Sequence, residues 1–538
     1  MTILEKNIQA LLSGVNEPLG NKLLNFIQNK TCSRFNIDEN LNIYDKTHNV
    51  FMYENLEEEL NFFYQSILEK TPRYPFVCIY GIGNALLIKN LAKHYKHLFV
   101  FESEIELFIL ALSTIDLSEE LCSGKIYLVD IEEERVDIQL LILFDMKDMF
   151  EYLSLYEMFV NNSFYKQFCE KTWCETDEFC KKNIEIVIRD SGLNSNLSFQ
   201  SYFHFLQNIP SMLESIPFQR ILSQRKNKFD NAIVVSAGPS LAKQLPLLKA
   251  CQDKAVIFCA DGALSMLEKE GIVPDYVTNL DFTDLAMKFF QNKENKTSLN
   301  ILSCATHPNV AHSLKAENCM IVLRNKALYQ RFNFNDFGYI DTGTHVSHFS
   351  YTLALALGFK NIIMIGQDLA FDEEGNSHSK GFDFGEKFSG EENIDKLKIP
   401  AYAGKGEVLT HTTWNDYRIK LEYLFACNDQ KAKFYNATEG GARINFTEEL
   451  SFKECCEKLL TKEKPKFELP KSLTKNRSDK LLVKFKEKIQ KDQENAKRFL
   501  DDALALKQIL ENILSKDFIL PLEFLEKVYQ NIENFNHS

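Results

Sequence analysis

The sequence predicts an α/β protein whose centre is a Rossmann-like domain with a parallel sheet. Short apolar runs alternate with helical patterns between residues 231 and 371. The first run leads directly into Gly238-Pro239-Ser240, and polar residues follow several of the others. This alternation is typical of a doubly wound parallel sheet, because each connection between parallel strands needs a crossover, usually a helix.

The predicted strands of the central domain are short apolar runs bounded by turn residues. The first opens at residue 231 and leads into the Ser-Ala-Gly-Pro-Ser turn, and four more cover residues 255–260, 276–280, 300–304 and 361–365. Strand patterns stop after about Glu448, so we expect this domain to span residues 226–447.

A second α/β domain is predicted before the central one, over residues 1–225, with a mainly helical lead-in. Its apolar runs at residues 75–80, 97–102 and 125–130 predict three further strands. Residues 150–225 are rich in aromatic residues and have mostly helical patterns, which are expected to close this domain.

The turn after the first of these strands, Gly81-Ile82-Gly83, is followed about twenty residues later by Glu102. This spacing is the minimal pattern of a dinucleotide or S-adenosylmethionine site. Leu86 stands where a third glycine is expected, so the fingerprint is incomplete. The sequence therefore predicts a nucleotide-type fold here and leaves ligand binding open.

Residues 448–538 are predicted to form an α-helical domain. Apolar residues at helical spacing, such as Phe485 and Ile489, predict one long amphipathic helix over residues 475–515. A final helix is predicted after Pro521. Lysines cluster in this region but alternate with Glu and Asp, which indicates a solvated helix face.

The composition indicates a soluble, cytoplasmic protein with several domains. A chain of 538 residues exceeds one ordinary hydrophobic core. Its formal charge of −13 excludes a general nucleic-acid binder, because affinity for the phosphate backbone needs clustered Lys and Arg. Thirteen cysteines without a CxxC pair or a metal spacing indicate reduced thiols. Neither a secretion signal nor a transmembrane span is predicted.

The strongest local signal for function is Gly238-Pro239-Ser240, between a strand and a helix. Gly238 permits close backbone approach, Pro239 suits the first helical turn, and Ser240 adds a hydroxyl among unsatisfied N–H groups. Such a turn is suited to a nucleotide phosphate. A plain strand-to-helix turn is the alternative interpretation.

Polar residues also follow other predicted strands: Asp261, Asn279, Asp281, and Gln367 with Asp368. The carboxyl ends of parallel strands meet at one edge of a sheet, so these side chains are expected to converge there. Asp and Asn at strand ends suit ribose hydroxyls, a cytosine edge or a metal-bound phosphate. For any single Asp, a helix cap is the alternative.

Three further features complete the predicted site. Thr342-Gly343-Thr344 precede a helix with small residues and predict a second helix N-terminus suited to an anion.

His378, in a polar and mobile loop, is the best candidate for a general base, because imidazole titrates near neutral pH. An exposed loop histidine is the alternative. Glu439 and Arg443, in a glycine-rich cluster, either bind a polar substrate or belong to a hairpin turn.

Together these motifs resemble two related groups of enzymes. Similarity to the CMP-sialate-dependent bacterial sialyltransferases is carried by residues 238–241, the strand end around Cys259, and residues 342–358, 366–368 and 378–380. With residues 436–442 included, most of the chain resembles more closely the motility accessory factor (Maf) family. Members of that family are implicated in transferring nonulosonic acids to Ser and Thr of flagellin.

The resemblance implies a glycosyltransferase that moves a pseudaminic or legionaminic acid from a CMP-activated donor to flagellin, in support of flagellar assembly and motility. It implies that His378 removes the acceptor proton, with Asp368 as the other catalytic residue. The helix N-termini at Ser240 and Thr344 would hold CMP, and the glycine-rich cluster would hold the sugar. No cofactor beyond the CMP-sugar is implied, and a divalent metal is left open.

Three positions depart from the sialyltransferase pattern. Ala260 stands where an Asn is expected, and an Arg before the Thr-Gly segment is replaced by Tyr339 or its neighbours. Ala370 stands where a Tyr stabilises the leaving phosphate. Phosphate contacts must then come from Arg324, Lys380 or the two helix N-termini.

Two other functions fit parts of the sequence. The run from Ala260 to Asp281 is also similar to thiamine and pterin pyrophosphokinases, which use carboxylates with Mg²⁺ and ATP. A non-catalytic flagellin-binding assembly factor is the third candidate, because the Tyr and Arg that contact phosphate are missing.

Overall fold

The chain divides into two units, Met1–Asn194 and Ser195–Ser538, in the computed structural model that gives its fold. The residues that the structure describes are 2–13, 16–133, 135–146, 149–191, 195–290, 298–388 and 395–514. The helix predicted after Pro521 lies outside these ranges.

The second unit extends beyond the central domain expected from the sequence. α10 (Ser195–Glu214) and α11 (Phe218–Arg225), which the sequence assigned to the first domain, belong to this unit. Apolar residues of α18 (Phe452–Lys458) and α19 (Lys475–Leu514) pack into its core. The boundaries expected at residues 225 and 447 therefore fall inside one unit.

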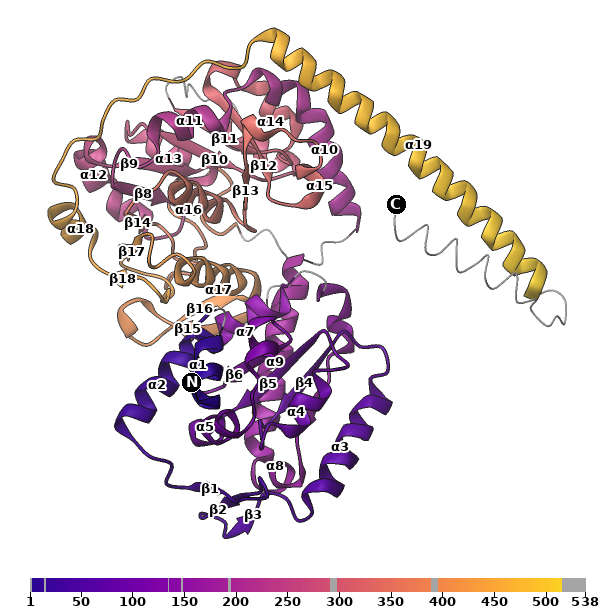
Figure 1. Cartoon of the computed structure of the whole chain (residues 1–538). Coiled ribbons are helices and arrows are strands. Elements are labelled where there is room, and N and C mark those ends of the chain that lie inside the picture. The colour runs from indigo at the N-terminus through magenta and orange to yellow at the C-terminus, as the bar shows by residue number, and fades with distance from the viewer. Residues whose placement is uncertain are drawn as a thin grey trace. The chain divides into compact units, whose positions relative to one another are not determined.

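A parallel sheet forms the centre of the second unit and confirms the predicted Rossmann-like α/β fold (Figure 1). In the described ranges this sheet has nine strands, and every neighbouring pair of them is parallel. Their order across the sheet is β13 (Tyr339–Ile340), β12 (Cys319–Arg324), β11 (Leu299–Ser303), β10 (Tyr276–Asn279), β9 (Val256–Ala260), β8 (Asn231–Val235), β14 (Asn361–Ile365), β17 (Lys433–Asn436) and β18 (Glu448–Glu449). β8 begins at the expected residue 231, and the other four predicted strands lie within one residue of their expected ends.

The strand order reverses between β8 and β14. From β8 the chain adds β9 to β13 on one side, and from β14 it adds β17 and β18 on the other. In open parallel sheets, ligands bind outside the carboxyl ends of the strands at such a switch point. The turns after β8 and β14 are therefore the first place to look for a site.

Helices cover both faces of this sheet, as a doubly wound fold requires. Along β8, Ile233 and Val235 face one side, Ala232 and Val234 face the other, and all are fully buried. The first face is covered by α10, α12 (Leu241–Cys251), α13 (Leu264–Lys269), α14 (Pro308–Ser313), α15 (Ala327–Gln330), α18 and α19. The second face is covered by α11, α16 (Val346–Ala356) and α17 (Thr412–Ala426).

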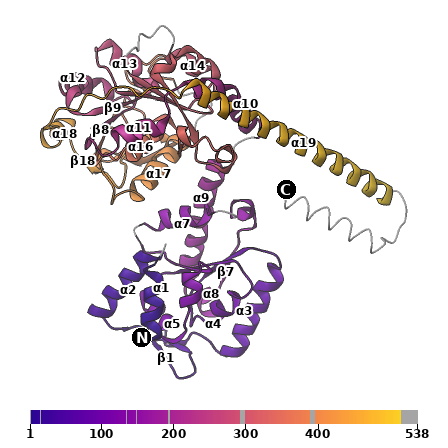
Figure 2. The ribbon, with the colours of Figure 1, turned by 45° about the horizontal axis from the view of Figure 1, so that its top comes forward.

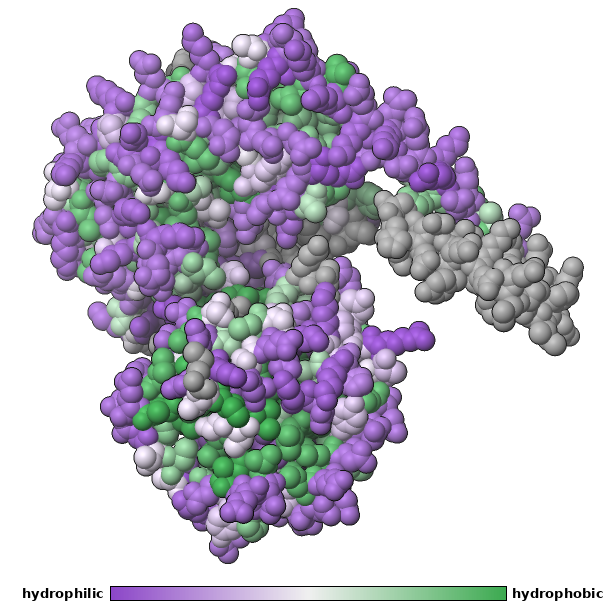
Figure 3. All heavy atoms as spheres, viewed as in Figure 1, coloured by the Kyte–Doolittle hydropathy of each residue, from purple (hydrophilic) through white to green (hydrophobic). Residues whose placement is uncertain are grey.

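α19 is the long amphipathic helix predicted over residues 475–515. Leu481, Leu482, Phe485 and Ile489 pack against the core of the first face. The two ribbon views show α19 passing alongside α10 and then continuing past the sheet (Figure 1, Figure 2). Its visible surface is mostly hydrophilic, as the alternation of Lys with Glu and Asp predicts (Figure 3). Within the described ranges, no helix has both the length and the hydrophobicity of a bilayer span.

The first unit is a smaller α/β domain, as predicted. In its described part, four parallel strands form a sheet in the order β6 (Ile126–Asp130), β5 (His97–Glu102), β4 (Phe76–Tyr80) and β7 (Met158–Val160). A separate antiparallel sheet contains β1 (Phe35–Ile37), β2 (Ile43–Asp45) and β3 (Val50–Phe51). The helices are α1 (Ile3–Leu11), α2 (Glu17–Asn29), α3 (Leu56–Lys70), α4 (Leu86–Leu91), α5 (Ile105–Thr114), α6 (Ser118–Cys122), α7 (Val136–Phe144), α8 (Ser163–Phe168) and α9 (Glu170–Ser191).

The Gly81-Ile82-Gly83 turn follows β4, and the protein's own side chains fill the space beside it. A Cβ on Gly81 would lie 2.3 Å from the ring of Tyr165, and the N–H of Gly83 donates to the Tyr165 hydroxyl over 3.1 Å. That hydroxyl donates to buried Glu102 over 2.6 Å, and Glu102 also accepts the N–H of Ile82. The groups that would meet a nucleotide here are bonded to one another.

Removal of the Tyr165 hydroxyl should destabilise the first unit, because Glu102 and the N–H of Gly83 would each lose a buried partner. We expect Tyr165→Phe to lower the free energy of unfolding by about 1–3 kcal/mol. Thermal unfolding of the variant measures this loss. Tyr152→Phe is the matched control, because Tyr152 is 40% exposed. Equal melting temperatures for the two variants would contradict the role of Tyr165.

Candidate functional site

A small cavity of about 110 Å³ lies at the switch point, beside the turns that follow β8 and β14. It is lined by Ser236, Ala237, Gly238, Gly366, Gln367, Asp368, Leu369, Ser377, His378 and Trp414. Three predicted motifs thus meet here: the Gly-Pro-Ser turn, the strand end at Asp368, and the loop that carries His378.

The carboxylate of Asp368 binds the walls of this cavity together. It accepts the N–H of Ser240 over 3.2 Å and the Ser240 hydroxyl over 2.7 Å. The backbone carbonyl of Asp368 accepts the N–H of Ala442 over 2.7 Å. Ser240 precedes α12, so the carboxylate lies at a helix N-terminus, where the helix dipole favours negative charge. The position predicted for a nucleotide phosphate at Ser240 is occupied by the protein's own anion.

Glycine is required where two other segments approach Asp368. A Cβ on Gly238 would lie 2.1 Å from Oδ2 of Asp368 and 2.5 Å from the carbonyl oxygen of Gly366. Gly441 has a φ of +72°, and a Cβ there would lie 2.4 Å from the Asp368 backbone. The predicted glycine-rich cluster therefore lets the chain after β17 pack directly on Asp368.

Gln367 connects the cavity to α16. Its Oε1 accepts the hydroxyl of Ser236 over 2.8 Å and that of Tyr351 over 3.4 Å. Tyr351 belongs to α16 and is fully buried. The side chain of Gln367 is thus held by a residue that follows β8 and by a residue of α16.

The loop that carries His378 is packed onto the Gly-Pro-Ser turn. Ser379 donates its N–H to the carbonyl of Ala237 over 2.9 Å, and its hydroxyl oxygen accepts the N–H of Ala242 over 3.0 Å. Ser377 and Ser379 are both buried. The sequence predicted a mobile loop beside the site, whereas these contacts tie the backbone next to His378 to the start of α12.

The ring of His378 lies in an aromatic environment. It stacks on Phe382 with ring centroids 3.9 Å apart, and its centroid lies 6.4 Å from that of Trp414. Burial lowers the pKa of His378 to about 4. The imidazole is therefore neutral at pH 7 and can accept a proton.

The hydrogen bonds of Ser377 indicate which nitrogen of His378 accepts that proton. The Ser377 hydroxyl lies 2.9 Å from Nδ1 of His378, and it also reaches the carbonyls of Glu386 and Phe388. A serine has one hydroxyl proton, and the carbonyls can only accept it. In the tautomer that satisfies all three contacts of the hydroxyl, Nδ1 of His378 donates to Ser377 and Nε2 is the basic nitrogen.

Burial raises the pKa of Asp368 to about 6, and the hydrogen bonds from Ser240 partly oppose this rise. Asp368 is thus ionised at neutral pH and becomes protonated under mildly acidic conditions. The cavity combines a neutral histidine with a carboxylate that is costly to ionise. Shifts of this kind, in opposite directions, are frequent at functional sites.

Asp261 and Asn279 end neighbouring strands and bond to each other through the Asn279 amide. The turn after Asp261 borders the cavity wall, because a Cβ on Gly262 would lie 3.6 Å from that of Ala237. Asp281 lies further along the edge, where it accepts the N–H of Thr283 over 2.8 Å. In the described part of the chain, no three His, Cys, Asp or Glu side chains are arranged to hold a metal ion.

Thr342, Gly343 and Thr344 precede α16, which packs against β8, β9 and β10. Gly343 has a φ of +60°, and a Cβ there would lie 2.3 Å from the ring of His348. Thr342 is buried, and the N–H of Gly343 donates to Asp341 over 3.0 Å. These residues do not line the cavity, but they form the start of the helix to which Gln367 is bonded.

Glu439 and Arg443 lie apart from the cavity. The carboxylate of Glu439 accepts the N–H of Phe452 at the start of α18. Arg443 is exposed, and its guanidinium lies next to Gly404. Neither side chain lines the cavity that contains Asp368 and His378.

The sequence did not single out Ser236, Ser377 or Trp414, all of which line the cavity. Trp414 belongs to α17, which follows a hairpin of β15 (Lys396–Pro400) and β16 (Glu407–His411). The chain contains only two tryptophans, and one directly after a strand was a usable signal. The serines that flank His378 were another.

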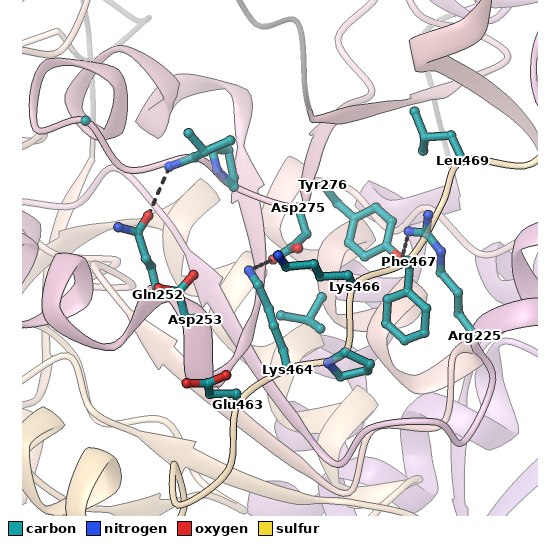
Figure 4. Close-up of a pocket in the computed structure, with 15 residues that line it drawn as sticks. Arg225, Gln252, Asp253, Asp275, Tyr276, Glu463, Lys464, Lys466, Phe467 and Leu469 are labelled. Carbon is teal, nitrogen blue, oxygen red and sulfur yellow. Dashed lines mark hydrogen bonds and ion pairs between the residues drawn. The ribbon is translucent and has the colours of Figure 1, made fainter.

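A larger cavity of about 740 Å³ lies at the opposite edge of the sheet, along residues 463–469 (Figure 4). Tyr276, the first residue of β10, lines it. Three of its charged side chains are bonded within the protein: Arg225 donates to the Tyr276 hydroxyl, and Lys464 pairs with Asp275, both over 2.6 Å. Ligands of parallel sheets bind at the carboxyl ends. The smaller cavity is therefore the candidate functional site.

Comparison with known proteins finds a similar protein family and similar solved structures. The family model described as 6-hydroxymethylpterin diphosphokinase MptE-like matches residues 203–374, which include Asp368 and end before His378. The family match covers seven of the nine strands of this sheet, from β8 to β14, and not β17, β18 or the rest of the chain. A solved structure, a MAf glycosyltransferase from Magnetospirillum magneticum AMB-1, is similar over 90% of this chain and 78% of that chain, with 17% identity and a TM-score of 0.46. No curated protein matches the chain.

Gly238→Ala should destabilise the second unit, because the added methyl group meets a backbone carbonyl and a buried carboxylate. We expect a loss of about 1–3 kcal/mol in unfolding free energy, as for other overpacked sites. The melting temperature measures it. Gly440→Ala is the matched control, because a Cβ there would meet its nearest neighbour at 3.6 Å. If the two variants have equal melting temperatures, the claim that Gly238 has no room for a Cβ is wrong.

Asp368→Asn should remove a pH dependence of stability. The folded-state pKa of about 6 lies above the ordinary value of 3.8, so the native carboxyl binds its proton more tightly than the unfolded one. This tighter proton binding adds its full amount to the free energy of unfolding below pH 3.8, and the added stability is lost as the pH rises through 6. We expect the wild-type stability relative to Asp368→Asn to fall by about 3 kcal/mol across this window. Paired melting curves from pH 4 to 7 test this, and parallel curves would refute it.

Proposed function

We propose that this chain is a glycosyltransferase that moves a nonulosonic acid, of the pseudaminic or legionaminic acid type, from its CMP-activated donor to Ser or Thr hydroxyls of flagellin. One observation carries the proposal. Residues 238, 366–368 and 377–378 are distant in sequence but line a single cavity at the switch point. These segments belong to the motifs that resemble the CMP-sialate-dependent enzymes. The proposed reaction takes place in the cytoplasm, before flagellin is exported.

His378 is proposed as the general base. Its Nδ1 donates to Ser377, so Nε2 has the lone pair that accepts the proton of an attacking hydroxyl. The oxygen of that hydroxyl bonds to the anomeric carbon while the bond from this carbon to the CMP phosphate breaks. A general base contributes about 10²–10⁴-fold to such reactions.

Asp368 is proposed to have an electrostatic role in addition to its structural one. Departure of CMP from the sugar leaves positive charge on the ring, as in an oxocarbenium ion. An ionised carboxylate in a buried cavity stabilises such charge more strongly than it would in water, because the effective dielectric constant is lower. The hydrogen bond from the Ser240 hydroxyl fixes this carboxylate, and Gly441 packs on the Asp368 backbone, before substrate binds.

The alternatives are distinguished by their requirements. The matched family is described as a diphosphokinase, an activity that would require ATP, Mg²⁺ and carboxylates that hold the metal. In this structure the carboxylate of Asp261 accepts bonds from Asn279 and from the N–H of Gly262. A non-catalytic flagellin-binding factor would need the protein fold but not the basic nitrogen of His378.

The test is the intact mass of flagellin from cells that lack this protein and are complemented with variants. Wild type should restore the glycosylated mass, and His378→Asn should reduce the transfer rate by about 10²–10⁴-fold. His312→Asn is the matched control, because His312 is exposed on α14. The purified protein should also transfer sugar from a CMP-nonulosonate to flagellin.

Three outcomes would contradict this function. An unchanged flagellin mass in the deletion strain removes the transferase proposal. Full glycosylation with His378→Asn, together with its loss in the deletion strain, favours a binding factor. Strict dependence on ATP and Mg²⁺ with a pterin or thiamine substrate favours a pyrophosphokinase.

A further inference from the structure

The starts of α12 and α16 differ in what they offer to an anion. At α12, Asp368 accepts the N–H of Ser240, and Ser379 accepts the N–H of Ala242. At α16 there is no side-chain cap, and no described group from elsewhere in the chain accepts the first helical N–H groups. Unpaired N–H groups at a helix start attract anions. Of the two helix starts that the sequence nominated, only that of α16 is open to a ligand.

Three side chains at the start of α16 have buried polar atoms that lack a partner in the described chain. These atoms are Oγ1 of Thr344, Nε2 of His345 and Nδ1 of His348. His348 is 5% exposed, and its ring centroid lies 5.7 Å from that of His345. Buried polar atoms are nearly always paired, so a cluster of unpaired ones indicates a site for a polar ligand.

This cluster lies next to the cavity that contains His378. The ring of His345 stacks on Tyr417 of α17 with centroids 4.7 Å apart. Trp414, which lines the cavity, lies one turn earlier on the same helix, about 5 Å along its axis. On the other side, Tyr351 of α16 donates to Gln367 of the cavity. Two helices thus place the cluster beside the reacting groups.

The cluster also has suitable chemistry for a phosphate. Nδ1 of His345 lies 2.8 Å from the Ser347 hydroxyl. If that hydroxyl donates to Nδ1, Nε2 of His345 is protonated and points a donor at the ligand. Burial lowers the pKa of His345 and that of His348, so neither brings a permanent charge that would have to be paired in the unliganded protein.

The other groups nominated for phosphate are less well placed. Arg324 ends β12, and β9, β10 and β11 separate β12 from β8. At about 4.8 Å per strand, Arg324 therefore starts about 19 Å from the switch point. Lys380 is exposed beside its buried neighbour Ser379. Ala370 has no polar side chain.

We propose that Thr344, His345 and His348, together with the first N–H groups of α16, bind the phosphate of the CMP leaving group. This inference rests on the proposed function and names the part of the site that holds the departing phosphate. The two histidines would take the place of the Tyr and Arg that the related sialyltransferases use and this chain lacks.

The test compares the binding of two probes, CMP and cytidine, by titration calorimetry on the full-length protein. Wild type should bind CMP at least ten- to a hundredfold more tightly than cytidine, since a hydrogen bond to a charged group contributes roughly this factor. Thr344→Val and His348→Ala should each lose about tenfold of that preference and keep the affinity for cytidine. Thr344→Val is nearly isosteric, so it reports on the site even if His348→Ala unfolds. His312→Ala is the control.

The possible failures are distinguishable. If folded Thr344→Val and His348→Ala keep the full preference for CMP, the phosphate is bound elsewhere and this inference is wrong, while the proposed function stands. If wild type binds neither CMP nor cytidine, the proposed function and this inference both fail. Loss of affinity for both probes alike in the variants would place the cluster against the nucleoside and would also overturn the phosphate assignment.

Discussion

One buried carboxylate organises the carboxyl edge of the central sheet. Asp368 accepts the N–H and the hydroxyl of Ser240, and Gly238 and Gly441 approach it so closely that neither could carry a Cβ. The turn after β8, the end of β14 and the segment after β17 are therefore held in one geometry. Ionisation of Asp368 costs free energy, because burial raises its pKa to about 6. The ionised carboxylate thus lowers the stability of the folded protein but keeps a charge in a fixed position in the cavity. Such a cost in stability is common at functional sites.

Much of the fold follows from the sequence because the buried strands are continuous apolar runs between turns. β9, β10, β11 and β14 were predicted to within one residue, and β8 was predicted to begin at residue 231. β1, β2, β3 and β7 were missed, since none has more than three residues and no period can show over that length. β12 was missed although it is apolar, because the helix that follows it has only four residues and gives no alternation.

The candidate site could be predicted only in part. The meeting of Gly238, Asp368 and His378 follows from parallel strands, whose carboxyl ends share one edge. The partner of each buried group does not follow, because it is set by packing across long stretches of chain. Ser240 and Asp368 are 128 residues apart, and Gly83 and Tyr165 are 82 apart. The protein thus has two nucleotide-type folds, and in the first its own tyrosine fills the space that a ligand would need.

The segment between α18 and α19 supplies partners to the buried cation of Arg225. The guanidinium of Arg225 lies 5.5 Å from the ring centre of Tyr276 and 5.1 Å from that of Phe467, and it donates to the carbonyl of Glu468 (Figure 4). A chain that ended before residue 463 would leave Arg225 without Phe467 and Glu468, two of these three neighbours. The C-terminal region therefore stabilises the central domain, which is not an independent folding unit.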